Sequence, residues 1–271
     1  MTGAQYKNEH NTEALQDTSI HYWHVQAITV AQTDVTVARG LRPGLGLEAI
    51  IPVRLVRGRI RYEDLARRPY TLQYPDYHHR NETSVRLADP TVSLHLGHVG
   101  SAWTLSGRAG VSIPLGRTEP NPFELGRLGL PHEHFQFGTG AWDPVFVLAA
   151  GRQLGHTPIT ATAFAHLRLY ENDHGYRAGD RYSLSLSGTR PIRGEWSGSL
   201  TLDFTREEAE RWSGLLEEEG NLGRTDAMVS VGVGRPVAGA SLSIAIGIPV
   251  YSRVHGEQGE QPLVFSLTWT H

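Results

Sequence analysis

The last nine residues of the chain alternate strictly between two kinds of side chain. One face holds only large apolar groups, at Leu263, Phe265, Leu267 and Trp269, and the residues between them are small or polar apart from Val264. A period of two places the two kinds of side chain on opposite faces of a β-strand. The segment therefore predicts a strand with one apolar face and one mostly polar face.

The same alternation recurs in five earlier segments. They are Trp103–Leu115, Ile159–Tyr170, Trp196–Thr205, Ala227–Gly234 and Leu242–Tyr251. Opposite the apolar residues stand mostly Ser, Thr, Gly and Ala, whereas the wet face of a soluble β-sandwich is usually rich in Lys, Glu and Thr. Small polar residues opposite an apolar face are typical of a membrane β-barrel, in which the apolar face meets lipid and the small residues line a crowded, wet interior.

Composition excludes one class of membrane protein. The chain has 271 residues, 39% of them hydrophobic, and a mean hydropathy of −0.32. No segment approaches the roughly 18 consecutive apolar residues of a membrane helix.

The lack of Cys fits a chain that crosses an oxidising periplasm. Met1–Gly3 leads into polar residues without a signal-peptide pattern, so secretion requires that the sequence be the mature part of a longer precursor.

Turns and loops predict the topology. Five short, Gly-bearing connections are Gly40–Gly44, Gly97–Gly100, Gly151–Gly155, Gly188–Gly194 and Gly234–Gly239. They alternate with six longer polar stretches, at Leu15–Ile20, Glu63–Glu82, Arg117–His134, Glu171–Arg181, Arg206–Asp226 and Ser252–Gln261. We expect one all-β domain over residues 1–271, an antiparallel up-and-down transmembrane β-barrel of about 12 strands. Short turns and both termini face the periplasm, and long loops face the cell exterior.

Two short motifs carry a family resemblance. Gly138–Pro144 reads Gly-Thr-Gly-Ala-Trp-Asp-Pro, and Pro114-Leu115-Gly116 ends another strand. From about Thr83 onward the chain resembles a family of outer-membrane transporter-like barrels named for a putative phenol-degradation MetA pathway. The resemblance implies a location in the bacterial outer membrane and a role in transport. His271 departs from the aromatic residue that usually ends such barrels.

Strand parity predicts which side chains meet lipid and which line the pore. If the apolar faces meet lipid, the charged residues between them point inward and Arg–carboxylate pairs cross a narrow pore. The predicted lipid-facing residues are Leu242, Ile244, Ile246, Ile248, Phe265, Leu267 and Trp269. The predicted pore-lining residues are Glu48, Arg54, Arg108, His166, Arg168, Asp203 and Ser266.

The segment Arg206–Glu219 differs from its surroundings. Ala209, Trp212, Leu215 and Leu216 recur at helical spacing among glutamates. The pattern predicts a short amphipathic helix that either folds inward as a partial plug or lies along the headgroup region; a solvated loop without a role is the simpler alternative. The glutamates make this mouth acidic, which favours cations over anions.

Neither the histidine clusters nor any nucleophile motif in the sequence indicates an enzyme active site. His78-His79, His132-Glu133-His134, and His21 with His24 could ligate a metal, but loop histidines at the surface are the expected interpretation. No nucleophile elbow follows a strand. We therefore expect a channel or porin without cofactor or metal, whose partners are the bilayer and small solutes, not nucleic acid, and which can form a homo-oligomer. A plugged barrel that binds surfaces with its loops is the alternative, and a lipid-modifying outer-membrane enzyme the third.

Overall fold

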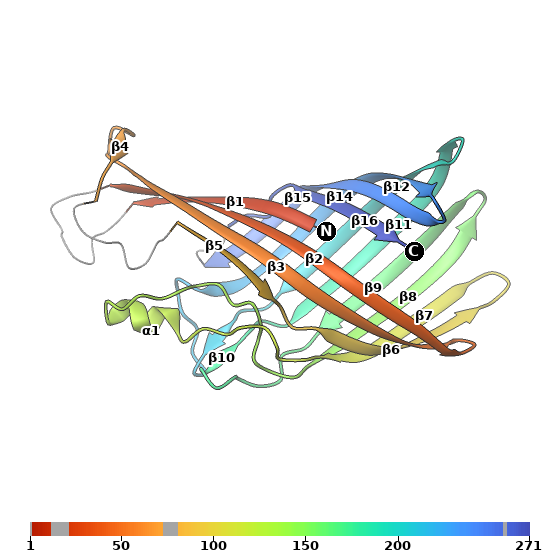
Figure 1. Cartoon of the computed structure of the whole chain (residues 1–271), viewed down its shortest axis with the longest axis horizontal. Coiled ribbons are helices and arrows are strands. Elements are labelled where there is room, and N and C mark those ends of the chain that lie inside the picture. Colours follow the sequence, from red (N-terminus) through yellow and green to blue (C-terminus); the bar gives the residue numbers. More distant parts are fainter. Residues whose placement is uncertain (1, 12–21, 73–80, 257–258) are drawn as a thin grey trace.

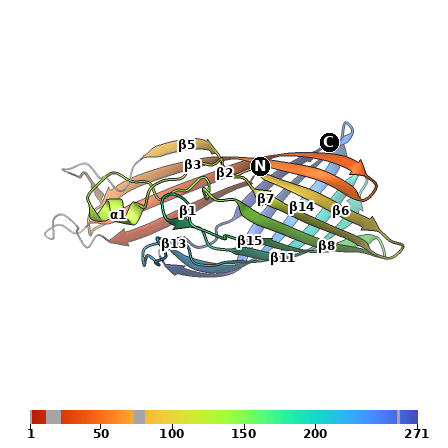
Figure 2. The ribbon, with the colours of Figure 1, turned by 90° about the horizontal axis from the view of Figure 1, so that it is seen from below.

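A single antiparallel sheet dominates the structure, a computed structural model that describes residues 2–11, 22–72, 81–256 and 259–271. Figure 1 shows its strands running obliquely side by side, and Figure 2 shows the same wall from below. The strands are β1 (Thr2–Asn11), β2 (Trp23–Arg42), β3 (Leu45–Glu63), β4 (Pro69–Tyr70), β5 (Glu82–Leu87), β6 (Thr91–Val99), β7 (Thr104–Ser112), β8 (Asp143–Leu154), β9 (Thr157–His166), β11 (Arg181–Arg193), β12 (Trp196–Glu207), β14 (Asn221–Val237), β15 (Ala240–Gly256) and β16 (Val264–Thr270).

The strand path returns to its start. Consecutive wall strands pair antiparallel from β2 round to β16, and β1 pairs both β2 and β16. The seam between β1 and β16 is short, with Thr2 opposite Ser266 and Gly3 opposite Phe265. β5 and β6 pair successive parts of β3, separated by Ala88–Pro90, and together act as one wall strand. Leaving out the two-residue β4, the described residues give a wall of twelve strands, so the predicted fold class is confirmed.

All five predicted short turns are present. They join β2 to β3, β6 to β7, β8 to β9, β11 to β12, and β14 to β15. Tight hairpins need residues with positive φ, which glycine adopts without a steric penalty. Gly44 (φ 75°), Gly155 (φ 59°) and Gly194 (φ 58°) supply them. The turns lie at one end of the barrel, opposite the long connections (Figure 1).

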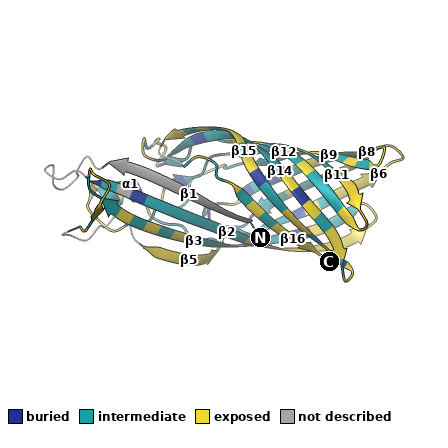
Figure 3. Ribbon diagram, turned by 90° about the horizontal axis from the view of Figure 1, so that it is seen from above, coloured by how far each residue is buried: buried dark blue, intermediate teal, exposed yellow. Residues whose placement is uncertain are grey.

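The two faces of the wall differ in exposure. In Figure 3 exposed residues alternate with intermediate ones along most strands. Large apolar side chains are exposed on β8, β11, β12 and β15 alike, for example Leu148, Leu184, Leu200 and Ile248. Residues of the opposite parity are small or polar, as in Ser183, Ser185 and Ser187 of β11. The barrel therefore carries its apolar surface outside, which suits a hydrocarbon surrounding.

Three short elements lie outside the wall, at the long-loop end. They are α1 (Pro122–Arg127), β10 (Tyr176–Arg177) and β13 (Arg211–Trp212), and β10 pairs β13. The buried aromatic cluster of the protein, Phe123, Tyr176 and Trp212, comes from these three elements. No helix in the described part of the chain is long and apolar enough to cross a membrane.

Candidate functional site

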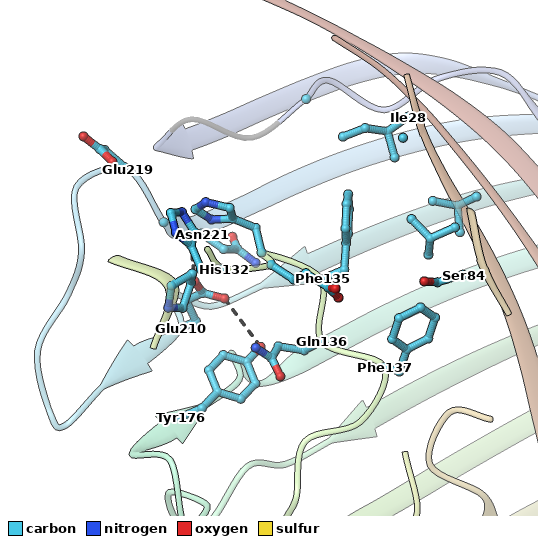
Figure 4. Close-up of a pocket in the computed structure, with 18 of the residues that line it drawn as sticks. Ile28, Ser84, His132, Phe135, Gln136, Phe137, Tyr176, Glu210, Glu219 and Asn221 are labelled. Atoms are coloured by element: carbon cyan, nitrogen blue, oxygen red, sulfur yellow. Dashed lines mark hydrogen bonds between the residues drawn. The ribbon is translucent and has the colours of Figure 1, made fainter. Parts of the chain in front are cut away.

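A cavity of about 500 Å³ occupies the barrel interior at the long-loop end. One side is wall, from inward-facing residues of β2, β3 and β5 such as Ile28, Val56 and Ser84. The other side is made by loops, with Phe135 and Gln136 from the segment between β7 and β8, and Tyr176 and Glu210 from the next two long connections (Figure 4). The long loops thus fold into the mouth of the barrel and line its interior.

Local sequence explains how α1 enters this site. Asn121 caps the helix, because its side-chain oxygen accepts hydrogen bonds from the backbone N–H groups of Phe123 (3.0 Å) and Glu124 (3.2 Å). Pro122 occupies the first turn, where no intrahelical donor is needed. Gly129, with φ 66°, follows its end. Arg127 then pairs with Glu217 at 3.2 Å, which ties α1 to the connection between β12 and β14.

The segment predicted as an amphipathic helix is not helical. Arg206 and Glu207 continue β12, and Arg211–Trp212 form the two-residue strand β13. Trp212 is only 3% exposed and packs on Tyr176 with ring centroids 4.7 Å apart. A strand pairing with β10 and this aromatic contact outweigh the weak helical periodicity of the segment. Trp212 turns inward and lines the cavity, whereas Leu215 and Leu216 are exposed, and a role of this segment as a plug stays a prediction.

Glu210 is the most deeply placed carboxylate of this loop. Its side chain accepts hydrogen bonds from the backbone N–H of Asn221 (3.3 Å) and the indole N–H of Trp212 (3.3 Å), and the Tyr176 hydroxyl lies 3.5 Å away (Figure 4). Burial raises the pKa of Glu210 above its ordinary value despite these donors. Burial also raises the pKa of the Tyr176 hydroxyl, with the charge of Glu210 adding to the effect. Protonation of Glu210 is thus coupled to the packing of the loop.

The prediction of surface histidines is wrong for His132. This side chain is 7% exposed, its Nδ1 lies 2.8 Å from the carbonyl oxygen of Leu130, and its ring stands edge-on to His134 at 5.0 Å. The loop that carries both residues folds inward and contributes to the cavity. His21 and His78-His79 lie outside the described residues, as does the side chain of His24. Within the described ranges, no three potential metal ligands come together.

A buried polar network joins the two ends of the connection between β7 and β8. Asp89 accepts hydrogen bonds from the backbone N–H groups of Gly116 (2.8 Å) and Thr139 (2.6 Å). The Thr139 hydroxyl donates to Asp143 (2.7 Å), which is fully buried and pairs with Arg168 at 2.7 Å. The sequence motif Gly138–Pro144 is therefore a structural device that holds this loop against the inner wall.

Close backbone contact makes two glycines of this network necessary. A Cβ atom on Gly116 would lie 2.7 Å from the backbone of Gly138, and one on Gly138 would lie 2.7 Å from the backbone of Gly116 and 2.4 Å from the carboxylate of Asp89. The roles of Asp89, Thr139 and Asp143 in this network carry no signal in the sequence pattern and were not predicted. Asn121-Pro122, the N-cap and first residue of α1, is a helix-start signal in the sequence that the prediction missed.

Six of the seven predicted pore-lining residues lie at inward-facing positions of their strands, whereas Arg168 lies two residues beyond the end of β9. Glu48 is buried and pairs with Arg108 at 2.8 Å, and Arg54 lines the cavity and donates to Gln32 at 3.0 Å. His166 is next to the pair of Arg168 and Asp143, with its ring nitrogen against the guanidinium. Asp203 and Ser266 also share the inner parity. The structure thus contains the predicted Arg–carboxylate pairs, whereas a role in conduction stays a prediction.

A second cavity of about 380 Å³ lies at the turn end, lined by residues such as Ser106, Ala149 and Thr160. It shares no lining residue with the first. Farther from the turns, the inward-facing residues of β7, β8 and β9 include Arg108, Val147 and Phe164. These three residues line neither cavity. The two cavities are therefore separate, one at each end of the barrel.

The predicted lipid-facing residues share the outer parity of β15 and β16. Ile244, Ile248, Phe265, Leu267 and Trp269 are exposed there, and Leu267 keeps 47% of its accessible surface. Leu242 and Ile246 have the same parity with intermediate exposure. A barrel in water would expose an unusually large apolar surface at these positions.

Structural comparison agrees with this architecture. An outer membrane channel of Pseudomonas putida F1 matches with a TM-score of 0.57 and 13% identity, over 99% of this chain and 93% of that one. OmpT of Vibrio cholerae, expressed in the outer membrane, matches with a TM-score of 0.44 and 10% identity, over 98% and 95% of the two chains. No protein-family model and no curated protein matches the sequence. The chain has an outer-membrane barrel fold. Together with the apolar outer face, this fold confirms the predicted location.

Proposed function

We propose that the protein is a narrow outer-membrane channel for small solutes. The observation that carries the proposal is the barrel interior, which has a cavity at each end and inward-facing charged side chains of both signs, among them the pair of Glu48 and Arg108. Charged side chains that line a narrow pore attract ions of opposite sign and so make the pore selective. The motif resemblance to phenol-degradation transporter-like barrels supports transport, and the neighbouring channel of Pseudomonas putida F1 supports the same class of function. We propose no catalytic role and no cofactor.

The proposal is tested by conductance in a planar bilayer. Asp203 is half-buried on the inner wall, and no ion pair involves it among the described residues, so its charge is available to permeating ions. We expect wild-type protein to give steady currents and Asp203→Asn to reduce its preference for cations, measured as the reversal potential in a salt gradient. Arg190→Gln, at an exposed position on the outer parity of β11, is the matched control and should leave the reversal potential unchanged.

A plugged barrel is the second candidate. It is favoured by the aromatic cluster of Phe123, Tyr176 and Trp212, which is buried inside the mouth where a solute would enter. Folded protein that carries no current with any salt would support this candidate and contradict the channel. Currents that are identical in the wild type and Asp203→Asn would show that this wall does not contact permeating ions.

A further inference from the structure

Three arginines follow one another on the outer face of β3. Arg57, Arg59 and Arg61 occupy successive positions of outer parity, and all three are exposed. The same face carries the exposed apolar residues Ile51 and Val53 just before them. Along this single strand the outer surface changes from apolar to cationic in the space of a few residues.

The level of this change matches the outer edge of a membrane. On β3, Arg57 lies ten positions after Leu47, and on β12, across the barrel, Arg206 lies ten positions after Trp196. Ten residues of a strand tilted by about 40° rise roughly 25 Å, the height of the apolar band of outer-membrane barrels. Since the turns face the periplasm in this orientation, the arginines stand at the headgroups of the outer leaflet.

Arg57 and Arg59 have no carboxylate directly beside them on the described parts of the neighbouring strands. Arg57 stands between Thr29 of β2 and Thr83 of β5, and Arg59 stands opposite Ala27. Among the described residues neither Arg57 nor Arg59 forms an ion pair, whereas Arg61 pairs with Glu63 at 2.9 Å. Small neighbours leave the two guanidinium groups accessible, and their charge is not neutralised within the described wall.

We propose that Arg57, Arg59 and Arg61 form a binding site for the phosphate groups of an anionic lipid in the outer leaflet. Guanidinium groups bind phosphate oxygens through charge-assisted, often paired hydrogen bonds. Successive outward positions on a strand lie about 7 Å apart, so the row can contact two phosphates of one headgroup. The acyl chains of the same lipid would cover the apolar residues below. The site fixes the depth of the barrel in the membrane and does not depend on conduction.

The test measures lipid retention by the purified, folded full chain. Wild-type protein in detergent is mixed with lipid A that carries two phosphates, or with the same lipid after enzymatic removal of both, and bound lipid is measured by native mass spectrometry. Arg57→Gln/Arg59→Gln should weaken binding of the phosphorylated lipid roughly twenty-five-fold, because a basic residue near an anionic membrane surface contributes about a factor of five. The phosphate-free lipid should bind weakly to both proteins.

Arg39→Gln/Arg190→Gln is the matched control, since it removes two exposed arginines from the outer parity at the turn end. It should retain wild-type affinity, and heat-modifiable migration on gels should show that both variants fold. Equal losses in the two double variants, or equal binding of the phosphate-free lipid, would overturn the proposal. Displacement of the lipid by millimolar inorganic phosphate would assign the site to free phosphate instead. Currents through Arg57→Gln/Arg59→Gln are measured as well. They test the channel proposal independently of lipid binding.

Discussion

At the scale of single residues, Glu210 links proton binding to loop packing. Burial raises its pKa in the folded protein, so the folded loop binds the proton more tightly than an unfolded loop does. The stability of the loop should therefore fall as the pH rises from the ordinary carboxyl value of 4.5 through the raised pKa. We expect hydrogen exchange in residues 208–220, corrected for its intrinsic pH dependence, to be faster at pH 8 than at pH 5.

Glu210→Gln should remove this pH dependence, because the neutral side chain has no proton to lose. Glu208 provides the control, since Arg206 beside it lowers its pKa, and Glu208→Gln should keep the wild-type trend. If Glu210→Gln and the wild type lose protection equally with rising pH, the coupling does not arise from Glu210.

At the scale of elements, the alternation of β16 places neighbouring residues in different surroundings, one on the outer face of the barrel and the next on the inner face. Leu267 lies on the outer face opposite Ile244 of β15, while Ser266 has the inner parity. Leu267→Arg should destabilise the barrel by at most about 2–4 kcal/mol, the cost of an arginine at the lipid midplane, because the cost falls toward the interfaces and Leu267 lies opposite Ile244, five residues after the turn at Gly239. Ser266→Arg should cost clearly less. Urea unfolding in phospholipid vesicles, followed by tryptophan fluorescence, measures both, and equal losses would mean that Leu267 does not meet hydrocarbon.

At the scale of the whole molecule, the arrangement of turns and loops fixes sidedness. We expect trypsin added to intact cells to cut in the connection between β3 and β5, where Arg67 and Arg68 are exposed. A tag on the C-terminal side of β16 should stay intact until the outer membrane is permeabilised. Digestion of the tag in intact cells would invert the orientation and remove the basis for the lipid-phosphate site.

The loop between β12 and β14 should resist the same protease longer than the connection after β3. Its Trp212 is buried, and the Arg127–Glu217 pair holds the loop against α1. Length and polarity of a loop alone would predict equal cleavage, so the difference measures how firmly the loops fold into the mouth.

The sequence alone determined the wall of the barrel. Strict alternation in β11, β12, β15 and β16 reports which face meets lipid, because a strand places successive side chains on opposite sides whatever its partners are. Positive-φ glycines such as Gly44 and Gly155 marked the hairpins, since turn geometry depends on a few adjacent residues. The count of turns and loops predicted about twelve strands, and strand parity predicted that Glu48 and Arg108 face inward, whereas their pairing comes from the structure.

Only the tertiary structure decided what fills the mouth. The stretch around Trp212 has helical spacing, yet it forms a strand because Tyr176, distant in sequence, offers a partner. His132 is buried because its whole loop turns inward, held by Asp89 and Thr139. Such loops carry no periodic signal, and their energy comes from contacts between segments that only the closed barrel brings together.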